Sequence, residues 1–174
     1  MTQQGLAGNL GGTIQFWSFQ FTYADLAGNA AASGVAATLN LYNQLSGPPY
    51  NTSIAMTIPQ GSFLIYARVK HSVAFTGGSI SAMTISMGKS GAATNFFTQA
   101  FNIFQTPADG TLQETFAMPN GQLSTFTPTV TFTPVGDKVA NCTAGVVNID
   151  VALFYVTTPA LYVANNVVLN SSVL

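Results

Sequence analysis

Apolar and polar residues alternate with a period of two along most of this chain. No segment of helical length shows a clear apolar stripe with a period of 3.6 residues. Alternation of this kind indicates β-strands with one buried face, and it predicts an all-β fold. The first expected strand is Thr13–Tyr23, whose one face carries the aromatic row Trp17, Phe19, Phe21 and Tyr23, expected to form a core layer.

The longest expected strand is Ser62–Phe75. Gly77 and Gly78 follow it closely, and we expect them to turn the chain into a hairpin with a strand over Ser79–Met87. Alternation assigns Phe63, Ile65, Ala67, Val69, Val73 and Phe75 to one face of the long strand, and Tyr66, Arg68 and Lys70 to the other.

Turn signals bound further expected strands, which brings the total to roughly eight to ten. Many short strands at regular spacing predict a single-domain antiparallel β-sandwich or jelly roll. We expect it to span residues 13–156, between an N-terminal arm (1–12) and a C-terminal arm (157–174). The further strands are Val35–Tyr42, Ser53–Ile58, Asn95–Gln105, Leu112–Met118, Phe126–Thr133 and Gly145–Val156.

Charged residues make up only 5% of the chain, against roughly 25% in an ordinary soluble domain. A neutral surface of this kind suits burial against neighbouring subunits, because charge normally keeps copies of a protein apart. The basic residues are too few to neutralise a run of phosphates, so we expect no direct nucleic-acid binding. The longest strongly apolar run, Val151–Val156, is too short for a membrane-spanning helix. The start, Met1–Gly12, lacks signal-peptide features, so we expect the mature chain to begin near Met1.

Few residues are suited to catalysis. His71 is the only histidine, and its place on the face of Val69 predicts a neutral, hydrogen-bonded histidine in the core or at an interface. Cys142 is the only cysteine, so an intrachain disulfide and a zinc site built on histidine and cysteine are not expected. We predict no catalytic residue, no cofactor and no metal site.

Two carboxylates lie inside expected strands, Glu114 and Asp150. A glycosidase needs such a pair across the scissile bond, which leaves an enzyme acting on polysaccharide as the last-ranked hypothesis. We expect Glu114 instead to point inward and pair with His71, Lys70 or Arg68, or to protect an edge strand. Calcium binding between subunits by loop carboxylates stays open.

A surface that binds saccharide carries exposed aromatic residues near polar side chains. Tyr66, beside Arg68 and Lys70, and Tyr50, in a Pro-Pro loop, are the candidates for such a surface. An aromatic residue at a subunit interface explains them equally well.

Four segments carry a resemblance to a known group of proteins: Ile58–Tyr66, Phe75–Gly78, Met83–Gly88 and Gly145–Tyr155. Over residues 54–156 the chain resembles the jelly-roll virion proteins of bacteriophages, which include head cement or decoration proteins and single-jelly-roll capsid proteins. The resemblance implies a β-sandwich that associates with itself, commonly as a trimer, and with other capsid proteins. It also implies a non-enzymatic protein made in the host cytoplasm and located in the virion, in the shell or on the capsid exterior. No functional residue is carried over.

Both ends of the chain, residues 1–24 and 151–174, are free of charge. We therefore expect the two arms to bridge subunits of an assembly, as part of a cement or decoration protein. A single-jelly-roll major capsid protein and a tail or fibre module that binds host glycans are the alternatives. The expected bridging residues are Leu6, Leu10, Leu161, Tyr162, Val163, Val167, Val168 and Leu169.

Overall fold

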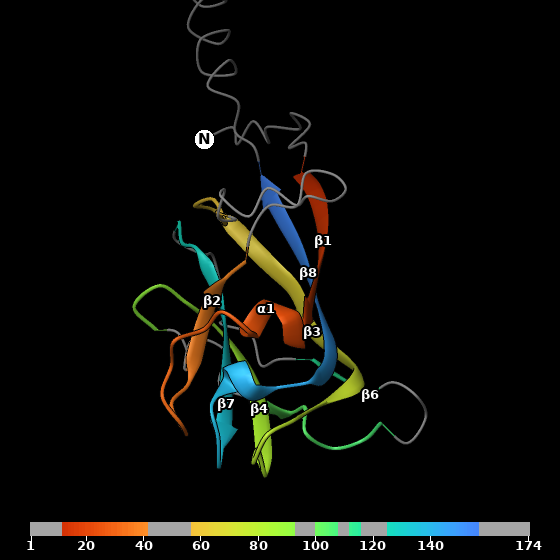
Figure 1. Ribbon diagram of the computed structural model, residues 1–174. Helices are drawn as coiled ribbons and strands as arrows, with labels where there is room; N and C mark the ends of the chain where they lie inside the picture. The colour runs from red at the N-terminus through yellow and green to blue at the C-terminus, as the bar shows by residue number, and fades with distance from the viewer. Residues whose placement is uncertain (1–11, 42–56, 93–99, 108–111, 116–124, 157–174) are drawn as a thin grey trace, which may run out of the picture.

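The computed structural model describes residues 12–41, 57–92, 100–107, 112–115 and 125–156, which form two four-stranded antiparallel sheets (Figure 1). In spatial order the first sheet contains β1 (Gly12–Thr22), β8 (Ala144–Val156), β3 (Ser62–Thr76) and β6 (Leu112–Thr115). The second contains β2 (Ala37–Asn40), β7 (Pro128–Val135), β4 (Ala82–Lys89) and β5 (Ala100–Asn102).

The pairing of the eight strands in the described residues follows one rule. β1 pairs with β8, β2 with β7, β3 with β6 and β4 with β5, all antiparallel. This is the pattern of one long hairpin folded over into two sheets. Two further pairings complete the sheets: β8 also pairs with β3, and β7 also pairs with β4. The arrangement is a jelly roll, and it confirms the predicted fold class.

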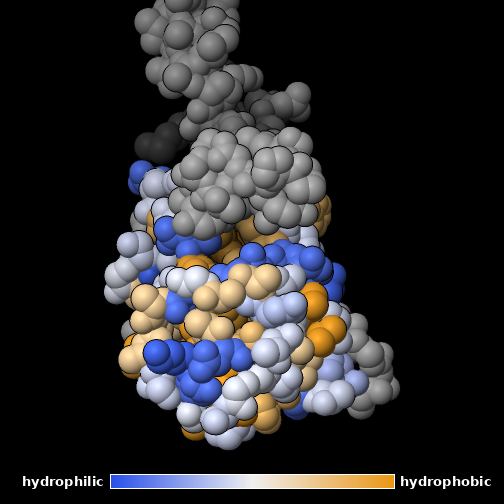
Figure 2. All heavy atoms as spheres, viewed as in Figure 1, coloured by the Kyte–Doolittle hydropathy of each residue, from blue (hydrophilic) through white to orange (hydrophobic). Residues whose placement is uncertain are grey.

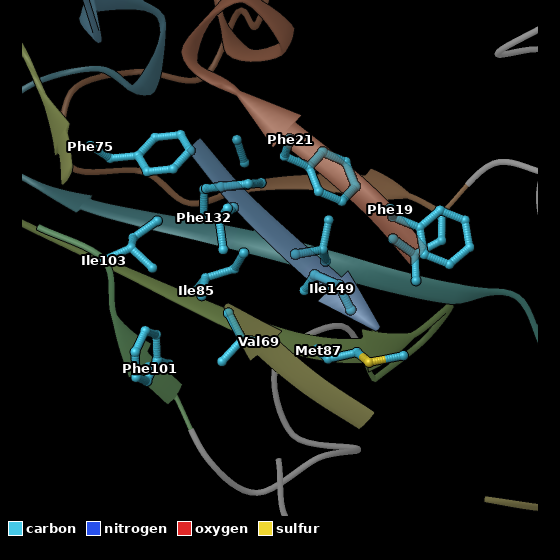
Figure 3. Packing of buried hydrophobic residues seen from close by; sticks show 14 of the residues in the cluster. Phe19, Phe21, Val69, Phe75, Ile85, Met87, Phe101, Ile103, Phe132 and Ile149 are labelled. Carbon is cyan, nitrogen blue, oxygen red and sulfur yellow. The ribbon is translucent and has the colours of Figure 1, made fainter. Parts of the chain in front are cut away.

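The core lies between the two sheets, and aromatic residues at its centre join them (Figure 3). The ring of Phe132, on β7, lies 5.8 Å from that of Phe21 on β1 and 5.5 Å from that of Phe75 on β3. Phe19 and Phe21 are buried as predicted, and Trp17 packs against the same cluster.

Tyr23 does not continue this aromatic row, because β1 ends at Thr22 and the short helix α1 (Tyr23–Leu26) begins. The Asp25 carboxylate accepts hydrogen bonds from the backbone N–H (2.7 Å) and the hydroxyl (3.0 Å) of Thr22, which satisfies groups at the helix start. Tyr23 is 42% exposed, so its predicted place in the core is wrong.

The alternation predicted for β3 is correct in the middle of the strand and wrong near its ends. Ala67, Val69 and Phe75 are buried, but Phe63, Ile65 and Val73 are exposed by 41–43%. The pairing of β3 with β8 shifts register three times, between Leu64 and Tyr66, between His71 and Val73, and between Val73 and Thr76. Each extra residue interrupts the alternation, so residues of one parity do not all reach the same face.

The predicted hairpin between the long strand and its successor is also wrong, because β3 and β4 belong to different sheets. Gly77 and Gly78 adopt positive φ angles of 141° and 53°, and they carry the chain from one sheet to the other. A residue just before β8 stabilises this crossing, because the Thr143 N–H donates a hydrogen bond to the Thr76 carbonyl at 2.8 Å.

Other expected strands are shorter in the structure. β2 begins at Ala37, which leaves Val35 50% exposed. Ile58 forms an isolated bridge with Phe126. Within the described part of the strand predicted over Asn95–Gln105, which begins at Ala100, β5 covers Ala100–Asn102 and ends before Ile103. A short 3-10 helix, η1 (Val139–Asn141), precedes β8. No helix among the described residues is long and apolar enough to cross a membrane.

The expected arms fall mostly outside the described residues, which begin at Gly12 and end at Val156. The division of the chain into arms and sandwich therefore stays a prediction. The bridging residues expected in both arms and Tyr50 also lie outside the described part.

Candidate functional site

The surface of the β1–β8–β3–β6 sheet that points away from the core is the most unusual feature of the described molecule. We call it the outer face. Strand register places residues of β1, β8 and β3 side by side in four rows along it. From the start of β1 the rows are Ile14, Phe154 and Phe63; Phe16, Ala152 and Tyr66; Ser18, Asp150 and Arg68; and Gln20, Asn148 and Lys70.

The first rows leave large apolar side chains exposed. Ile14 is 51% exposed and Phe16 67%, while Phe63 and Ile65 are 41% and 42% exposed. We call these four residues the apolar end of the outer face. It lies where β1 begins and β8 ends, since Gly12 pairs with Val156 there (the top of the molecule in Figure 1).

An apolar end of this kind is suited to contact with a partner. Burying one such side chain completely is worth roughly 1.5–3 kcal/mol, so several together favour association. Hydrophobic areas also lie directly beside hydrophilic ones on the surface seen in Figure 2. Exposed apolar side chains that lie together, as Ile14, Phe16, Phe63 and Ile65 do, mark sites of interaction with a partner.

The last two rows form a polar cluster centred on Asp150, which is only 7% exposed. Its carboxylate accepts a hydrogen bond from the Ser18 hydroxyl at 2.7 Å, and it forms ion pairs with Arg68 at 3.0 Å and Lys70 at 2.7 Å. The three donors come from the strands on both sides of β8. Asp150 therefore ties β1, β8 and β3 together across the sheet.

Two opposing effects set the ionisation of Asp150. Desolvation by burial raises the pKa of its carboxyl group, but the hydrogen bonds from Lys70, Ser18 and Arg68 together outweigh it. The net pKa lies below the ordinary value of an aspartate, so Asp150 is ionised at neutral pH. Both of its oxygens are already engaged, which suits a structural carboxylate better than one that moves protons.

Glu114 is the other carboxylate of the enzyme hypothesis. The structure describes its backbone but not its side chain. In β6 it pairs with Val69, while Thr115 pairs with Arg68. Its expected partners and its proposed role with Asp150 stay predictions, because its side chain is outside the described part.

His71 is completely buried, as predicted, with its ring edge-on to Phe101 at 6.3 Å. Neither ring nitrogen has a hydrogen-bond partner among the described residues. The expected pairing with Glu114 stays a prediction, because that side chain lies outside the described part. Burial lowers the pKa of His71, and the nearby backbone of Val73 opposes this effect only in part. His71 is therefore a neutral core residue at pH 7.

Asp137 and Cys142 flank η1. Asp137 accepts hydrogen bonds from the backbone N–H of Ser79 (2.9 Å) and of Lys138 (2.8 Å), and from the Asn141 amide (2.7 Å). These bonds lower its pKa, and they hold the loop before β4 against η1. Burial, with the charge of Asp137, raises the pKa of the Cys142 thiol to about 11. The described residues contain no group of three or more His, Cys, Asp or Glu side chains placed to hold a metal ion.

The structure brings three of the predicted surface residues together. Tyr66, Arg68 and Lys70 lie on the outer face, and the Arg68 guanidinium carbon lies 5.4 Å from the centre of the Tyr66 ring. The apolar end was not predicted as a site. A signal for half of it exists in the sequence, because Ile14 and Phe16 are large apolar residues on the face of β1 opposite its aromatic row.

Comparisons with known proteins give little guidance. No protein-family model matches the chain, and no curated protein does. Among solved structures, one similar chain comes from the cryo-EM structure of Mud crab tombus-like virus. The sequence identity is 12% and the TM-score is 0.41, and the match covers 89% of this chain and 86% of that chain. A likeness this distant does not identify a function, and the jelly-roll assignment rests on strand order and pairing.

Proposed function

We propose that this protein is a non-enzymatic structural subunit of a virus particle, namely a cement or decoration protein of a bacteriophage head. In this proposal it acts as a homo-oligomer, a trimer. The alternative within the same role is a single-jelly-roll major capsid protein. One observation carries the proposal: a jelly-roll sheet of an almost uncharged chain exposes Ile14, Phe16, Phe63 and Ile65 on its outer face.

A shell repeats one contact many times, so a modest neutral interface suffices when it is multiplied. A chain with 5% charged residues has little electrostatic repulsion between its copies. The jelly roll is a fold that viral capsid domains use, although lectin domains and cupins share it.

The proposed mechanism is adhesive. The sandwich supplies a rigid body that its two sheets hold together, and the outer face and the two uncharged terminal segments, 1–12 and 157–174, supply contacts with neighbouring subunits. The Asp150 cluster keeps the outer face in one shape, because it joins three strands beside the apolar end.

The decisive experiment locates the chain in particles from its native source. Antibody fragments raised against the recombinant chain should label the head of intact particles in electron micrographs. Labelling of the tail or fibres would contradict the head assignment, and absence of label from all particles would contradict the virion role.

A truncation tests the role of the arms. Removal of residues 160–174 should leave a folded domain, by circular dichroism, that no longer assembles or binds capsids. Unchanged capsid affinity in the truncated protein would show that this segment is not a bridging arm.

Glycan binding by a tail or fibre module is the second candidate, and the position of Tyr66 favours it. Its ring lies on the outer face beside Arg68 and Lys70, an arrangement that combines an apolar ring with polar groups. If the protein binds on a glycan array, Tyr66→Ala should abolish binding. Tyr23→Ala is the matched control, because Tyr23 is an exposed tyrosine on α1.

A further inference from the structure

We propose that the apolar end of the outer face is the docking site for the C-terminal segment, residues 160–174, of a neighbouring copy of this chain. The inference rests on the proposed assembly role, and it adds the surface and the segment that meet. Three features support it: the exposed residues of β1 and β3, the composition of the segment and the place where the chain leaves the sheet.

The docking surface lies beside a sheet edge with which no described strand pairs. β1 is an edge strand of its sheet in the described residues, and Gly12–Thr22 contains neither a charged residue nor a proline. Edge strands normally carry such residues to prevent pairing with other chains. The apolar end, with Phe16 67% exposed on this strand, offers side-chain contacts next to the outer backbone edge of β1.

The C-terminal segment has the matching chemistry. Residues 160–174 read Ala-Leu-Tyr-Val-Ala-Asn-Asn-Val-Val-Leu-Asn-Ser-Ser-Val-Leu, with no charge and several residues that favour strands. Such a segment can add backbone hydrogen bonds to a sheet edge while its apolar side chains cover exposed neighbours. Fully extended, it would reach roughly 50 Å, enough to cross to an adjacent subunit.

The exit point favours a neighbour over the chain's own sheet. β8 ends at Val156, beside the apolar end, so covering its own outer face would require an immediate reversal. Thr157-Thr158-Pro159 contains no glycine, asparagine or aspartate, the residues that adopt the positive φ angles of two-residue hairpin turns. Pro159 also favours an extended Thr158. We therefore expect the segment to continue away from its own sheet and to reach another copy.

Cysteine cross-linking between two chains tests this directly. In a Cys142→Ala background, one full-length chain carries Phe16→Cys and a differently tagged full-length chain carries Val167→Cys. After co-expression and mild oxidation, a disulfide-linked heterodimer should form in high yield. The matched control replaces Phe16→Cys by Val135→Cys, a 54% exposed position at the end of β7 in the other sheet, and it should give only background cross-linking.

Each other outcome overturns the proposal. An intrachain disulfide in a chain that carries both substitutions, without the heterodimer, would show that the segment covers its own sheet. Cross-linking of Phe16→Cys to Leu6→Cys instead of Val167→Cys would assign the surface to the N-terminal segment. Equal yields from the Phe16 and Val135 positions would show no specific docking.

A second measurement does not depend on disulfide geometry. Phe16→Glu should shift the oligomer to smaller species in sedimentation velocity, while Val135→Glu should leave it unchanged. An unchanged oligomer in Phe16→Glu would contradict the docking site. If the chain is found in virus heads but the heterodimer does not form, the docking site is wrong and the proposed function stands. If the heterodimer forms but no particle carries the chain, the proposed function is wrong and the docking site stands.

Discussion

Replacing Asp150 by alanine tests whether the polar cluster holds the outer face together. The substitution removes the acceptor of three hydrogen bonds, from Ser18 at 2.7 Å, Arg68 at 3.0 Å and Lys70 at 2.7 Å. Exposed ion pairs contribute about 0–1 kcal/mol, and breaking a buried pair costs about 3–5 kcal/mol. Asp150 is nearly buried, but the side chains of Arg68 and Lys70 are 35% and 34% exposed and can turn to water.

The expected loss for Asp150→Ala therefore lies between these limits, at about 2 kcal/mol in the free energy of unfolding. For a domain of this size it corresponds to a fall in Tm of roughly 4–8 °C. Urea unfolding at pH 7, followed by the fluorescence of Trp17, the only tryptophan, measures the change. Asp150→Asn keeps the shape and removes the charge, so we expect it to lose less than the alanine variant.

The contribution of Asp150 to the free energy of unfolding should depend on pH in a defined direction. The pKa of Asp150 is lowered in the folded protein, so its contribution is present above the unfolded value of 3.8 and is lost as the pH falls through the folded pKa. The difference between the natural protein and Asp150→Asn should shrink as the pH is lowered below 3.8. A loss at pH 7 below about 0.5 kcal/mol for Asp150→Ala would refute this reasoning, because a surface substitution without a partner has an effect of that size.

Three further predictions concern the core. The unfolded chain binds a proton on His71 more readily than the folded chain does, so the natural protein should lose stability as the pH falls below 6.5. In urea titrations, His71→Leu should remove this pH dependence and raise the free energy of unfolding at pH 7 by about 1–3 kcal/mol. Gly145 has a φ of 146° and lies against the Phe75 ring, so Gly145→Ala should cost about 2–4 kcal/mol by thermal unfolding, and a change within error would disprove the packing argument. Cys142 should react with a thiol reagent at pH 8 only after denaturation, and fast labelling of the folded protein would contradict its burial and its raised pKa.

Local alternation was enough to predict the all-β class, the longer strands and much of their burial. On β4, Met83, Ile85 and Met87 are buried as their spacing predicts, and Phe19 and Phe21 are buried on β1. The period of two survives in any regular strand, whatever its neighbours are. The low charge is equally a property of the sequence alone, and it predicts association with neighbouring subunits without any knowledge of the surface.

Pairing between distant strands decided the rest. Gly77 and Gly78 predict a turn from the sequence alone. The direction of that turn, toward the opposite sheet, depends on contacts with residues near η1, such as the hydrogen bond from the Thr143 N–H to the Thr76 carbonyl. The bulge next to Ile65 depends on the register with β8, and it helps to place Phe63 and Ile65 on the surface. The Asp150 cluster likewise needs β1, β8 and β3 side by side, although Ser18 and Asp150 are 132 positions apart. Contacts of such long range leave no local pattern, because each strand satisfies its own alternation whichever strand lies beside it.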